Sequence, residues 1–331
     1  MNLKVRFLGV RGSLPSPLAP SEIDDRIVSL LEDFLEFRKS QSSLSPRDFV
    51  DSIPFEKKGG FGGNTPCIEY TFGEDRLIID GGSGIRALGA ELMAGPCGKG
   101  KGELHIYLTH FHWDHLIGFP FFVPIFIPGN TIHIYGVHQE LEAVFKTLFK
   151  KPYFPVPFEQ LGAKLVFHSV PPRMPFSIGS IKVTPYQLDH PDPCWGARVE
   201  AGGRSVAHCV DTEATRTTDE QLGADLPLYQ NADLMIFDAM YTLGEAIEKM
   251  NWGHSAATIG LDLAFRQNIR KVVFMHHDPS SSDAKVAKAA AQTLRYYDSQ
   301  FKQARRQKVE LPAIEWSFAR EGLTIEFDEK H

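Results

Sequence analysis

Cysteine is scarce in this 331-residue chain, and no two cysteines form a Cys-x-x-Cys motif. We expect four free thiols, which is typical of a reducing compartment rather than of a disulfide framework. They are Cys67, Cys97, Cys194 and Cys209. The N-terminal segment is too short and too charged for a signal peptide, and it is typical of a first β-strand instead. These absences favour a cytoplasmic protein.

Long hydrophobic runs and an excess of basic residues are also missing. The most apolar stretch, Phe119–Pro128, has ten residues and three prolines, so it cannot span a bilayer and we expect no membrane partner. The net charge is −6 and the pI is about 6.1. We therefore expect nucleic acid not to be a partner, unless a local basic patch binds it.

Short segments rich in Val, Ile and aromatic residues recur along the chain and end in Gly, Pro, Asp or Asn, as strands do. The predicted strands are Val5–Val10, Cys67–Phe72, Arg76–Asp80, Leu104–Thr109, Thr131–Tyr135, Leu165–His168, Ile181–Leu188, Gly196–Glu200, Ser205–Val210, Leu234–Asp238, Lys271–Met275 and Leu323–Phe327. Helical patterns lie among them, at Ser83–Met93, Gln139–Lys150, Ser255–Gln267 and Asp283–Ala304. This interleaving predicts an α/β sandwich with sheets inside and helices outside.

One segment, between Pro17 and Gly59, has a different pattern. Ser21 with Asp24 is typical of a capping box, and apolar residues follow at helical spacing. Pro46 then stands at the first position of a second short helix. We expect a surface helical hairpin with its apolar stripe on the core, or alternatively a lid over the active site.

The run His110-Phe111-His112-Trp113-Asp114-His115 follows a predicted strand that ends at Thr109. Three imidazoles and a carboxylate on one loop form a dense set of ligands for zinc, iron or manganese. The alternative, a solvated polar turn, is disfavoured by the spacing. Four such ligands do not complete a site for two metals, so further ligands are expected at strand ends.

His190, Asp211 and His276 each follow a predicted strand. Any one of them alone is more often a structural residue than a ligand. Three at the carboxyl ends of strands, in a chain that also has the His110–His115 run, point together to a metal centre.

The chain resembles the metallo-β-lactamase superfamily along its whole length, and within it the branch of ribonuclease Z and the cyclic phosphodiesterases. The resemblance is carried by the His110–His115 run and by five further motifs. These are Arg6–Ser13, Gly62–Cys67, Ile79–Gly84, Asn251–Ser255 and His276–Pro279. It implies one domain over residues 1–331, with a helical insertion at about 20–58. The implied fold is an αββα sandwich, with two mixed sheets flanked by helices.

The resemblance implies two divalent metals, with zinc expected and manganese or iron as alternatives. The first would be held by His110, His112 and His190. The second would be held by Asp114, His115 and His276, with Asp211 bridging the two. The aspartate at position 211 argues against the cysteine-containing site of many true β-lactamases.

Further site residues follow from the same resemblance. Asp80 matches a buried carboxylate that orients a ligand imidazole, although it could also cap the turn before two glycines. His254 would protonate the leaving group or stabilise the transition state, and a helix-capping role is its alternative. We expect Asp114, as well as His254, to be catalytic. His277 is expected behind the ligands or facing the substrate.

The resemblance implies a phosphodiesterase for a cyclic nucleotide or a related small phosphodiester, acting through a hydroxide that bridges the metals. Arg11, Asn64 and Thr65 would offer donors to an anionic substrate, and Phe119–Pro128 is core or a wall of the cleft. The alternatives are a tRNA 3′-processing endonuclease, a lactam or thioester hydrolase, and a metal-binding sensor module. Because dimers are common in this branch, we also expect a homodimer.

Overall fold

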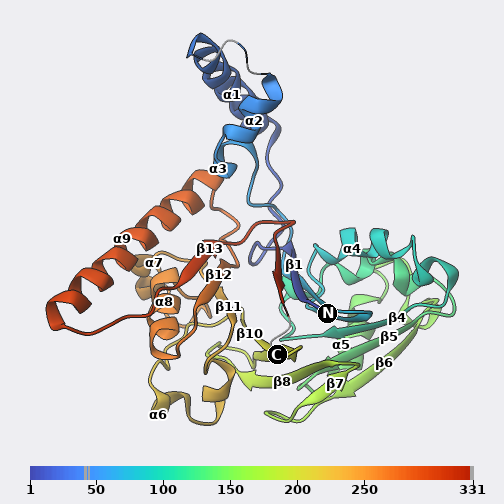
Figure 1. Cartoon of the computed structure of the whole chain (residues 1–331). Coiled ribbons are helices and arrows are strands. Elements are labelled where there is room, and N and C mark those ends of the chain that lie inside the picture. Colours follow the sequence, from blue (N-terminus) through green and yellow to red (C-terminus); the bar gives the residue numbers. More distant parts are fainter. Residues whose placement is uncertain (41–42, 44, 329–331) are drawn as a thin grey trace.

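Apolar residues alternate along the first strand, β1 (Leu3–Gly9), where Leu3, Val5 and Phe7 are buried between two β-sheets. Each sheet has seven strands, and helices cover both outer faces in the computed structural model (Figure 1). The predicted αββα sandwich with two mixed sheets is therefore confirmed. The structure describes residues 1–40, 43 and 45–328, so the last three residues of the predicted domain lie outside the described range.

The first sheet has the order β14-β1-β2-β3-β4-β5-β6, in which β3 to β6 run parallel. Its other strands are β2 (Cys67–Phe72), β3 (Asp75–Ile79), β4 (Glu103–Tyr107), β5 (Thr131–Gly136), β6 (Lys164–Ser169) and β14 (Thr324–Phe327). Helices α4 (Ile85–Leu92) and α5 (Leu141–Leu148) bury their apolar faces in the core on its outer side.

The second sheet has the order β13-β12-β11-β10-β9-β8-β7, in which β10 to β13 run parallel. Its strands are β7 (Phe176–Ile178), β8 (Ile181–Gln187), β9 (Trp195–Ala201), β10 (Arg204–Cys209), β11 (Leu234–Asp238), β12 (Lys271–Met275) and β13 (Glu315–Phe318). Helices α8 (Ala257–Arg266) and α9 (Asp283–Gln307) pack on its outer side, and α6 (Asp219–Leu222) and α7 (Leu243–Glu248) are short.

Every predicted strand and helix of the body is present within a few residues of its expected bounds. Two strands were not predicted, β7 and β13. Both are edge strands of three and four residues, too short to show a clear alternation of apolar and polar residues. Within the described residues, no helix is long and apolar enough to cross a membrane.

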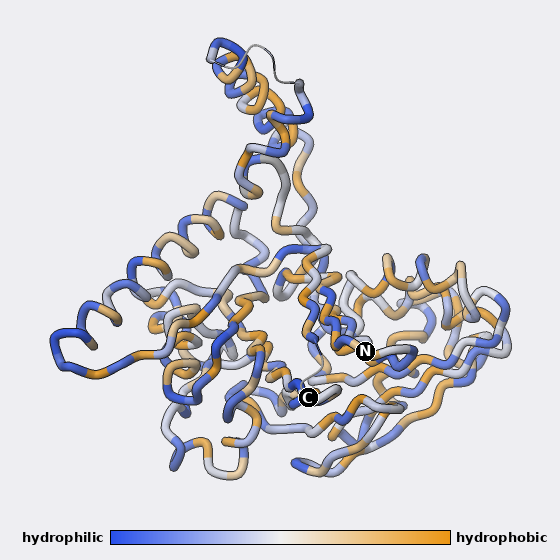
Figure 2. The backbone as a smooth tube through the Cα atoms, viewed as in Figure 1, coloured by the Kyte–Doolittle hydropathy of each residue, from blue (hydrophilic) through white to orange (hydrophobic). Residues whose placement is uncertain are grey.

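The insertion forms a projecting arm made of α1 (Pro20–Ser40), α2 (Pro46–Ser52) and α3 (Phe55–Lys58). Figure 1 shows the arm pointing away from the body, so it does not lie as a closed lid in this structure. The expectation that its apolar stripe packs on the core is wrong, because none of the described side chains of α1 is buried. Orange segments along the arm in Figure 2 mark these apolar residues.

The two predicted helix starts in the arm have different outcomes. Ser45 caps α2 through a capping box with Asp48, with Pro46 at the first position, as expected. The predicted box of Ser21 and Asp24 is wrong, because α1 already begins at Pro20. Glu22 instead accepts a hydrogen bond from the backbone N–H of Ala19, at 2.7 Å, which leaves Ser21 inside the first turn.

Candidate metal centre

Three acidic or imidazole side chains follow strands of the two sheets directly or within two residues: Asp80 after β3, Asp211 after β10 and His276 after β12. Their φ angles are +63°, +62° and +65°, in the left-handed region that non-glycine residues seldom adopt. Strain of this kind is common at functional sites, where the surrounding structure holds the turn. Here the three turns bring their side chains to one place between the sheets.

The first group of ligand-type side chains contains His110, His112, His190 and Asp211, whose ligand atoms lie within 4.8 Å of one another. His110 and Asp211 are buried, and His110 Nε2 lies 3.2 Å from Asp211 Oδ2. The other two histidines are partly exposed, so this side of the centre is open to solvent.

The second group contains Asp114, His115, Asp211 and His276, all of which are buried. Asp211 Oδ2 lies 3.1 Å from His115 Nε2, and Asp211 Oδ1 lies 2.9 Å from His276 Nε2. Because Asp211 belongs to both groups, the structure places it where a bridging carboxylate would stand. All seven residues predicted as ligands are thus brought together, in the two predicted sets.

Several of these atoms are buried and make no hydrogen bond of good geometry, although three of them lie 2.9–3.2 Å from an atom of another ligand residue. They are His110 Nε2, His115 Nε2, His190 Nε2 and Asp211 Oδ1. An unsatisfied buried polar atom costs about 1–3 kcal/mol, and coordination of a metal would remove that cost. Imidazole and carboxylate donors suit zinc, manganese and iron. The side chains present therefore fit two divalent ions that share Asp211.

The pKa values of two of these histidines agree with binding of divalent ions. Burial lowers the pKa of His110 to about 4, and the nearby His115 adds to the effect, so His110 is neutral near pH 7, as a metal ligand must be. Burial alone would also lower the pKa of His276, but Asp211 and a hydrogen bond to Asp114 outweigh it and raise the pKa to about 10. A cation is therefore favoured between these two carboxylates.

Asp80 holds His115 from behind. Its Oδ2 accepts a hydrogen bond from His115 Nδ1 at 2.8 Å, which leaves Nε2 of the same ring directed at Asp211. The other carboxylate oxygen accepts a hydrogen bond from the backbone N–H of Thr109 at 3.0 Å. Asp80 thus has the position that the sequence predicts for it, and it fixes both the ring and the start of the ligand loop.

The loop after β1 supports the centre with its backbone. The N–H of Ser13 donates to Asp114 Oδ2 at 2.7 Å. Gly12 packs so closely against His276 that a Cβ at this position would lie 2.5 Å from His276 Nδ1. The motif around Gly12 therefore shapes the second group rather than a surface for substrate.

The expectation that Arg11, Asn64 and Thr65 offer donors to a substrate is not supported. Arg11 is buried, and its guanidinium donates to the backbone oxygens of Gly62 and Ser281 at 2.8 and 2.7 Å. Asn64 donates to Glu321 at 3.0 Å, and Thr65 is fully buried. All three residues hold loops together, because their polar atoms are used inside the protein.

His254 lies between the two groups of ligands. Its ring stacks on that of His276 at 4.9 Å between centroids, and it lies 6.3 Å from the ring of His190. Gly253 allows this approach: it has φ +86°, and a Cβ there would lie 2.2 Å from His190. Nδ1 of His254 donates to Asp238 at 2.9 Å, and the ring of Tyr241 lies 5.8 Å away.

Two acidic residues beside the centre were missed by the sequence reasoning, Asp238 and Asp192. Asp238 is fully buried at the end of β11 and also accepts a hydrogen bond from the N–H of Ser255 at 3.0 Å. Its place at a strand end, like that of Asp211, was a usable signal. Asp192 lies on an exposed loop, with Oδ2 at 2.9 Å from His112 Nε2, and no pattern in the sequence indicates this contact.

His277 is held by the backbone. Its Nε2 donates to the carbonyl oxygen of Ala319 at 2.8 Å, and burial, followed by smaller effects, lowers its pKa to about 4. Its ring also stacks on Phe318. These contacts tie the end of β12 to the strand beside it. Because the ring is buried, it does not face a substrate, and a place behind the ligands stays a prediction.

The stretch Phe119–Pro128 divides between core and cleft. Phe119, Phe122 and Ile125 are buried under α4 and α5. Phe121 is exposed instead and lines an apolar cavity of about 510 Å³. Because Trp113 of the ligand loop lines the same cavity, this cavity adjoins the metal-ligating run.

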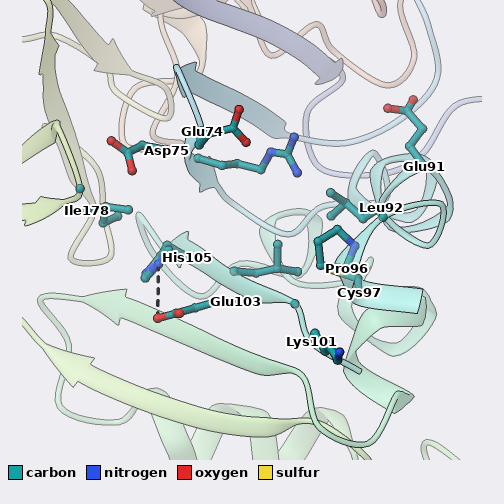
Figure 3. Close-up of a pocket in the computed structure, with 15 residues that line it drawn as sticks. Glu74, Asp75, Glu91, Leu92, Pro96, Cys97, Lys101, Glu103, His105 and Ile178 are labelled. Atoms are coloured by element: carbon teal, nitrogen blue, oxygen red, sulfur yellow. Dashed lines mark ion pairs between the residues drawn. The ribbon is translucent and has the colours of Figure 1, made fainter. Parts of the chain in front are cut away.

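A second cavity, of about 480 Å³ (Figure 3), lies near the amino-terminal ends of β3 and β4. It is lined by Asp75 and Arg76 at the start of β3 and by Glu103 and His105 of β4. The ligand residues follow the carboxyl ends of these strands, so this cavity is not part of the candidate centre.

Residues 75–277 match the family model described as the beta-lactamase superfamily domain. The chain belongs to the metallo-β-lactamase superfamily. As the resemblance predicts, part of its sequence is also similar to ribonuclease Z. The matched residues include both groups of ligands.

Among curated proteins, the chain is similar to ribonuclease Z of Staphylococcus carnosus, with 25% identity over 145 residues. That match covers 40% of this chain and 42% of the relative. The structure is similar to YhfI of Bacillus subtilis, a metallo-beta-lactamase fold protein, with a TM-score of 0.61, 17% identity and coverage of 98% and 99% of the two chains. Unliganded yeast PDE1 has the same TM-score, with 14% identity and 99% coverage of both chains.

Proposed function

We propose that the protein is a binuclear metal-dependent phosphodiesterase that acts on a cyclic nucleotide or a related small phosphodiester. The observation that carries this proposal is the place of His254, which lies between the two ligand groups and is oriented by the buried Asp238. Hydrolysis of a phosphodiester requires a proton for the departing oxygen, and an imidazole in this place can donate it.

The residues that would hold the metals are His110, His112, His190, Asp114, His115 and His276, with Asp211 shared. When bound, such ions would lower the pKa of a water molecule and polarise a phosphoryl oxygen. Zinc is the expected metal, with manganese or iron as alternatives.

The surrounding residues prepare this chemistry. Asp80 fixes the ring of His115, and Ser13 fixes the carboxylate of Asp114. Asp238 accepts a hydrogen bond from Nδ1 of His254, so that the other ring nitrogen is left to serve the leaving oxygen. The cavity beside Trp113 and Phe121 has an apolar lining that suits a nucleobase or another apolar ester group.

A tRNA 3′-processing activity is the second candidate, because the relative in Staphylococcus carnosus is a ribonuclease Z. The earlier expectation that nucleic acid is not a partner therefore lacks support. Charge disfavours this candidate: residues 20–58, the projecting arm, contain nine acidic and six basic residues. An acidic arm repels a phosphate backbone.

The test is a substrate panel with protein loaded with zinc or manganese. Its members are cyclic nucleotides, bis-p-nitrophenyl phosphate, a tRNA precursor with a 3′ trailer, a chromogenic lactam and a thioester. We expect turnover of the phosphodiesters, and loss of that turnover in His112→Ala, Asp211→Ala and metal-stripped protein. Equal rates after metal removal would refute the metallohydrolase, and cleavage of only the lactam, thioester or tRNA precursor would refute the assignment to small phosphodiesters.

A comparison of leaving groups tests the role of His254. A nitrophenolate leaves readily without a proton, whereas the alkoxide of a cyclic nucleotide does not. His254→Ala should therefore lower the rate on the cyclic nucleotide by roughly 10²–10⁴-fold and affect the nitrophenyl ester much less. His105→Ala, in β4 and lining the cavity away from the ligand loop, is the matched control and should leave both rates unchanged.

A further inference from the structure

Helix α1 of the projecting arm carries one wide apolar face, and in the described residues α2 covers one edge of it. Phe34 and Phe37 each lie 5.2 Å from the ring of Phe49 in α2. The rest of this face presents the exposed stripe, five residues with exposed fractions between 43% and 64%. The members of the exposed stripe are Ile23, Ile27, Val28, Leu31 and Leu35.

Two charged residues mark the ends of the exposed stripe. Asp24 and Arg38 stand seven residues before and seven residues after Leu31. Since seven residues make about two helical turns, both lie on the same side of the helix as Leu31. Ile27 and Leu35 likewise stand four residues before and after it. In an antiparallel pair of α1 helices centred on Leu31, apolar residues would therefore face apolar residues, and Asp24 would face Arg38.

We propose that the exposed stripe is the interface through which two copies of this chain dimerise, with their α1 helices antiparallel and a twofold axis at Leu31. Leu31 then packs on its own copy, and Ile27 packs on Leu35 of the other chain. Asp24 of each chain faces Arg38 of the other, with opposite charge at both ends. An isologous contact of this kind closes on itself and stops at a dimer.

The charges of the arm favour this occupant over two others. The sides of α1 carry the exposed carboxylates Asp25, Glu32 and Glu36 beside the exposed stripe. Helices that lie on membranes have Lys and Arg in those positions instead. A nucleic acid would be repelled by the same carboxylates. A second copy is attracted, because acidic and basic ends meet in the antiparallel pair.

The size of the contact sets its strength. A helix of 21 residues is about 31 Å long at 1.5 Å per residue. A pair of such helices buries less than the roughly 1,200–2,000 Å² of a standard interface, so we expect a dissociation constant on the order of micromolar. The arm points away from the body, which leaves room for a partner helix.

A disulfide trap tests the position of the axis. Cysteine at position 31 would lie next to itself across the twofold axis, so Leu31→Cys should form an interchain disulfide under mild oxidation. Ser29→Cys, on the opposite side of α1, is the matched control and should not. The four native cysteines are buried and will not compete. Equal cross-linking of the two variants, or none in Leu31→Cys, would contradict the proposed axis.

Charge reversal tests the register. By analytical ultracentrifugation at micromolar concentration, Asp24→Arg and Arg38→Asp should each weaken the dimer about tenfold or more, and the double variant should recover it. The pair Asp25→Arg and Lys39→Asp, beside the exposed stripe but not opposite each other in this register, should have little effect. Circular dichroism and phosphodiesterase rates verify that every variant is folded. A monomeric wild-type protein, or a dimer that none of these changes alters, would overturn the proposal.

Discussion

The carboxylate of Asp238 accepts a hydrogen bond from Nδ1 of His254 at 2.9 Å. Its second oxygen accepts hydrogen bonds from the N–H groups of Met240 and Ser255, at 3.1 and 3.0 Å. Because three donors hold this buried carboxylate, the orientation of the His254 ring is fixed before any substrate binds. Asp238 is therefore a positioning residue for the proposed proton donor.

The substitution Asp238→Asn should separate this role from folding. The amide oxygen of the new side chain can still accept both backbone hydrogen bonds, but its NH2 group would face Nδ1 of His254 and favour the wrong tautomer. We expect kcat on a cyclic nucleotide to fall by roughly 10²–10³-fold with little change in KM. The pH–rate profile should shift as well, which a merely structural role would not produce. An unchanged profile with a lowered melting temperature would contradict this interpretation.

Asp80 should control metal affinity through His115. Asp80→Asn weakens the hydrogen bond at 2.8 Å that fixes the imidazole, and loss of such a partner lowers metal affinity by roughly 10–100-fold. Competition with a chromogenic chelator measures the affinity directly. Glu74→Gln, in the exposed turn before β3, is the control. Unchanged affinity in Asp80→Asn would mean that Asp80 serves the turn alone.

The buried His208, outside the metal centre, should make the stability of the fold sensitive to acid. Burial lowers the pKa of His208 to about 4, whereas in the unfolded chain it is about 6.5. The neutral ring therefore stabilises the fold above about pH 6.5, and that stability is lost as the pH falls towards 4. The difference corresponds to roughly 3 kcal/mol. His110 and His277 should act in the same direction in metal-free protein.

Urea unfolding of metal-free protein between pH 7 and pH 4 measures this loss. His208→Phe removes the titrating ring, so its free energy of unfolding should depend less steeply on pH than that of the wild type. Tyr70→Phe removes the hydroxyl that lies 2.9 Å from His208 Nδ1 but keeps the ring, and it should retain the acid sensitivity. Identical slopes for His208→Phe and the wild type would show that His208 does not contribute.

The ligand residues could be predicted because their pattern is local. His110 to His115 form one run, and His190, Asp211 and His276 each follow a strand that alternation of apolar residues reveals. Strand order then brings them together, since ligands gather where parallel strands end. Asp238 obeys the same rule at the end of β11 and was within reach of the same argument.

The contacts that a side chain makes are harder to predict from the sequence than the strand or helix to which it belongs. Arg11 has the chemistry of an anion receptor, but its partners Gly62 and Ser281 are distant in sequence. The apolar residues of α1 have the spacing of a core-facing helix, and that spacing is the same whether the helix packs on its own body or on another molecule. Only the tertiary structure separates these cases.

Substitution of Arg11 separates two interpretations of this residue. A structural role predicts a loss of stability, whereas a role as a donor to substrate predicts a higher KM. Its buried guanidinium donates to two backbone oxygens and lies 3.4 Å from Asp283, which is also paired with Arg26. Removing one partner of a buried pair costs roughly 3–5 kcal/mol. Arg11→Met should therefore lower the melting temperature strongly and leave KM for an anionic ester unchanged.

Arg86→Met, on the exposed side of α4, is the control and should change neither quantity. Arg11→Lys keeps the charge but offers one ammonium in place of a planar fork, so it should recover only part of the stability. If Arg11→Met instead kept its melting temperature and raised KM, Arg11 would be a substrate donor after all. The hydrogen bonds of its guanidinium argue for the loss of stability, because the acceptors that Arg11 leaves behind are buried or partly buried.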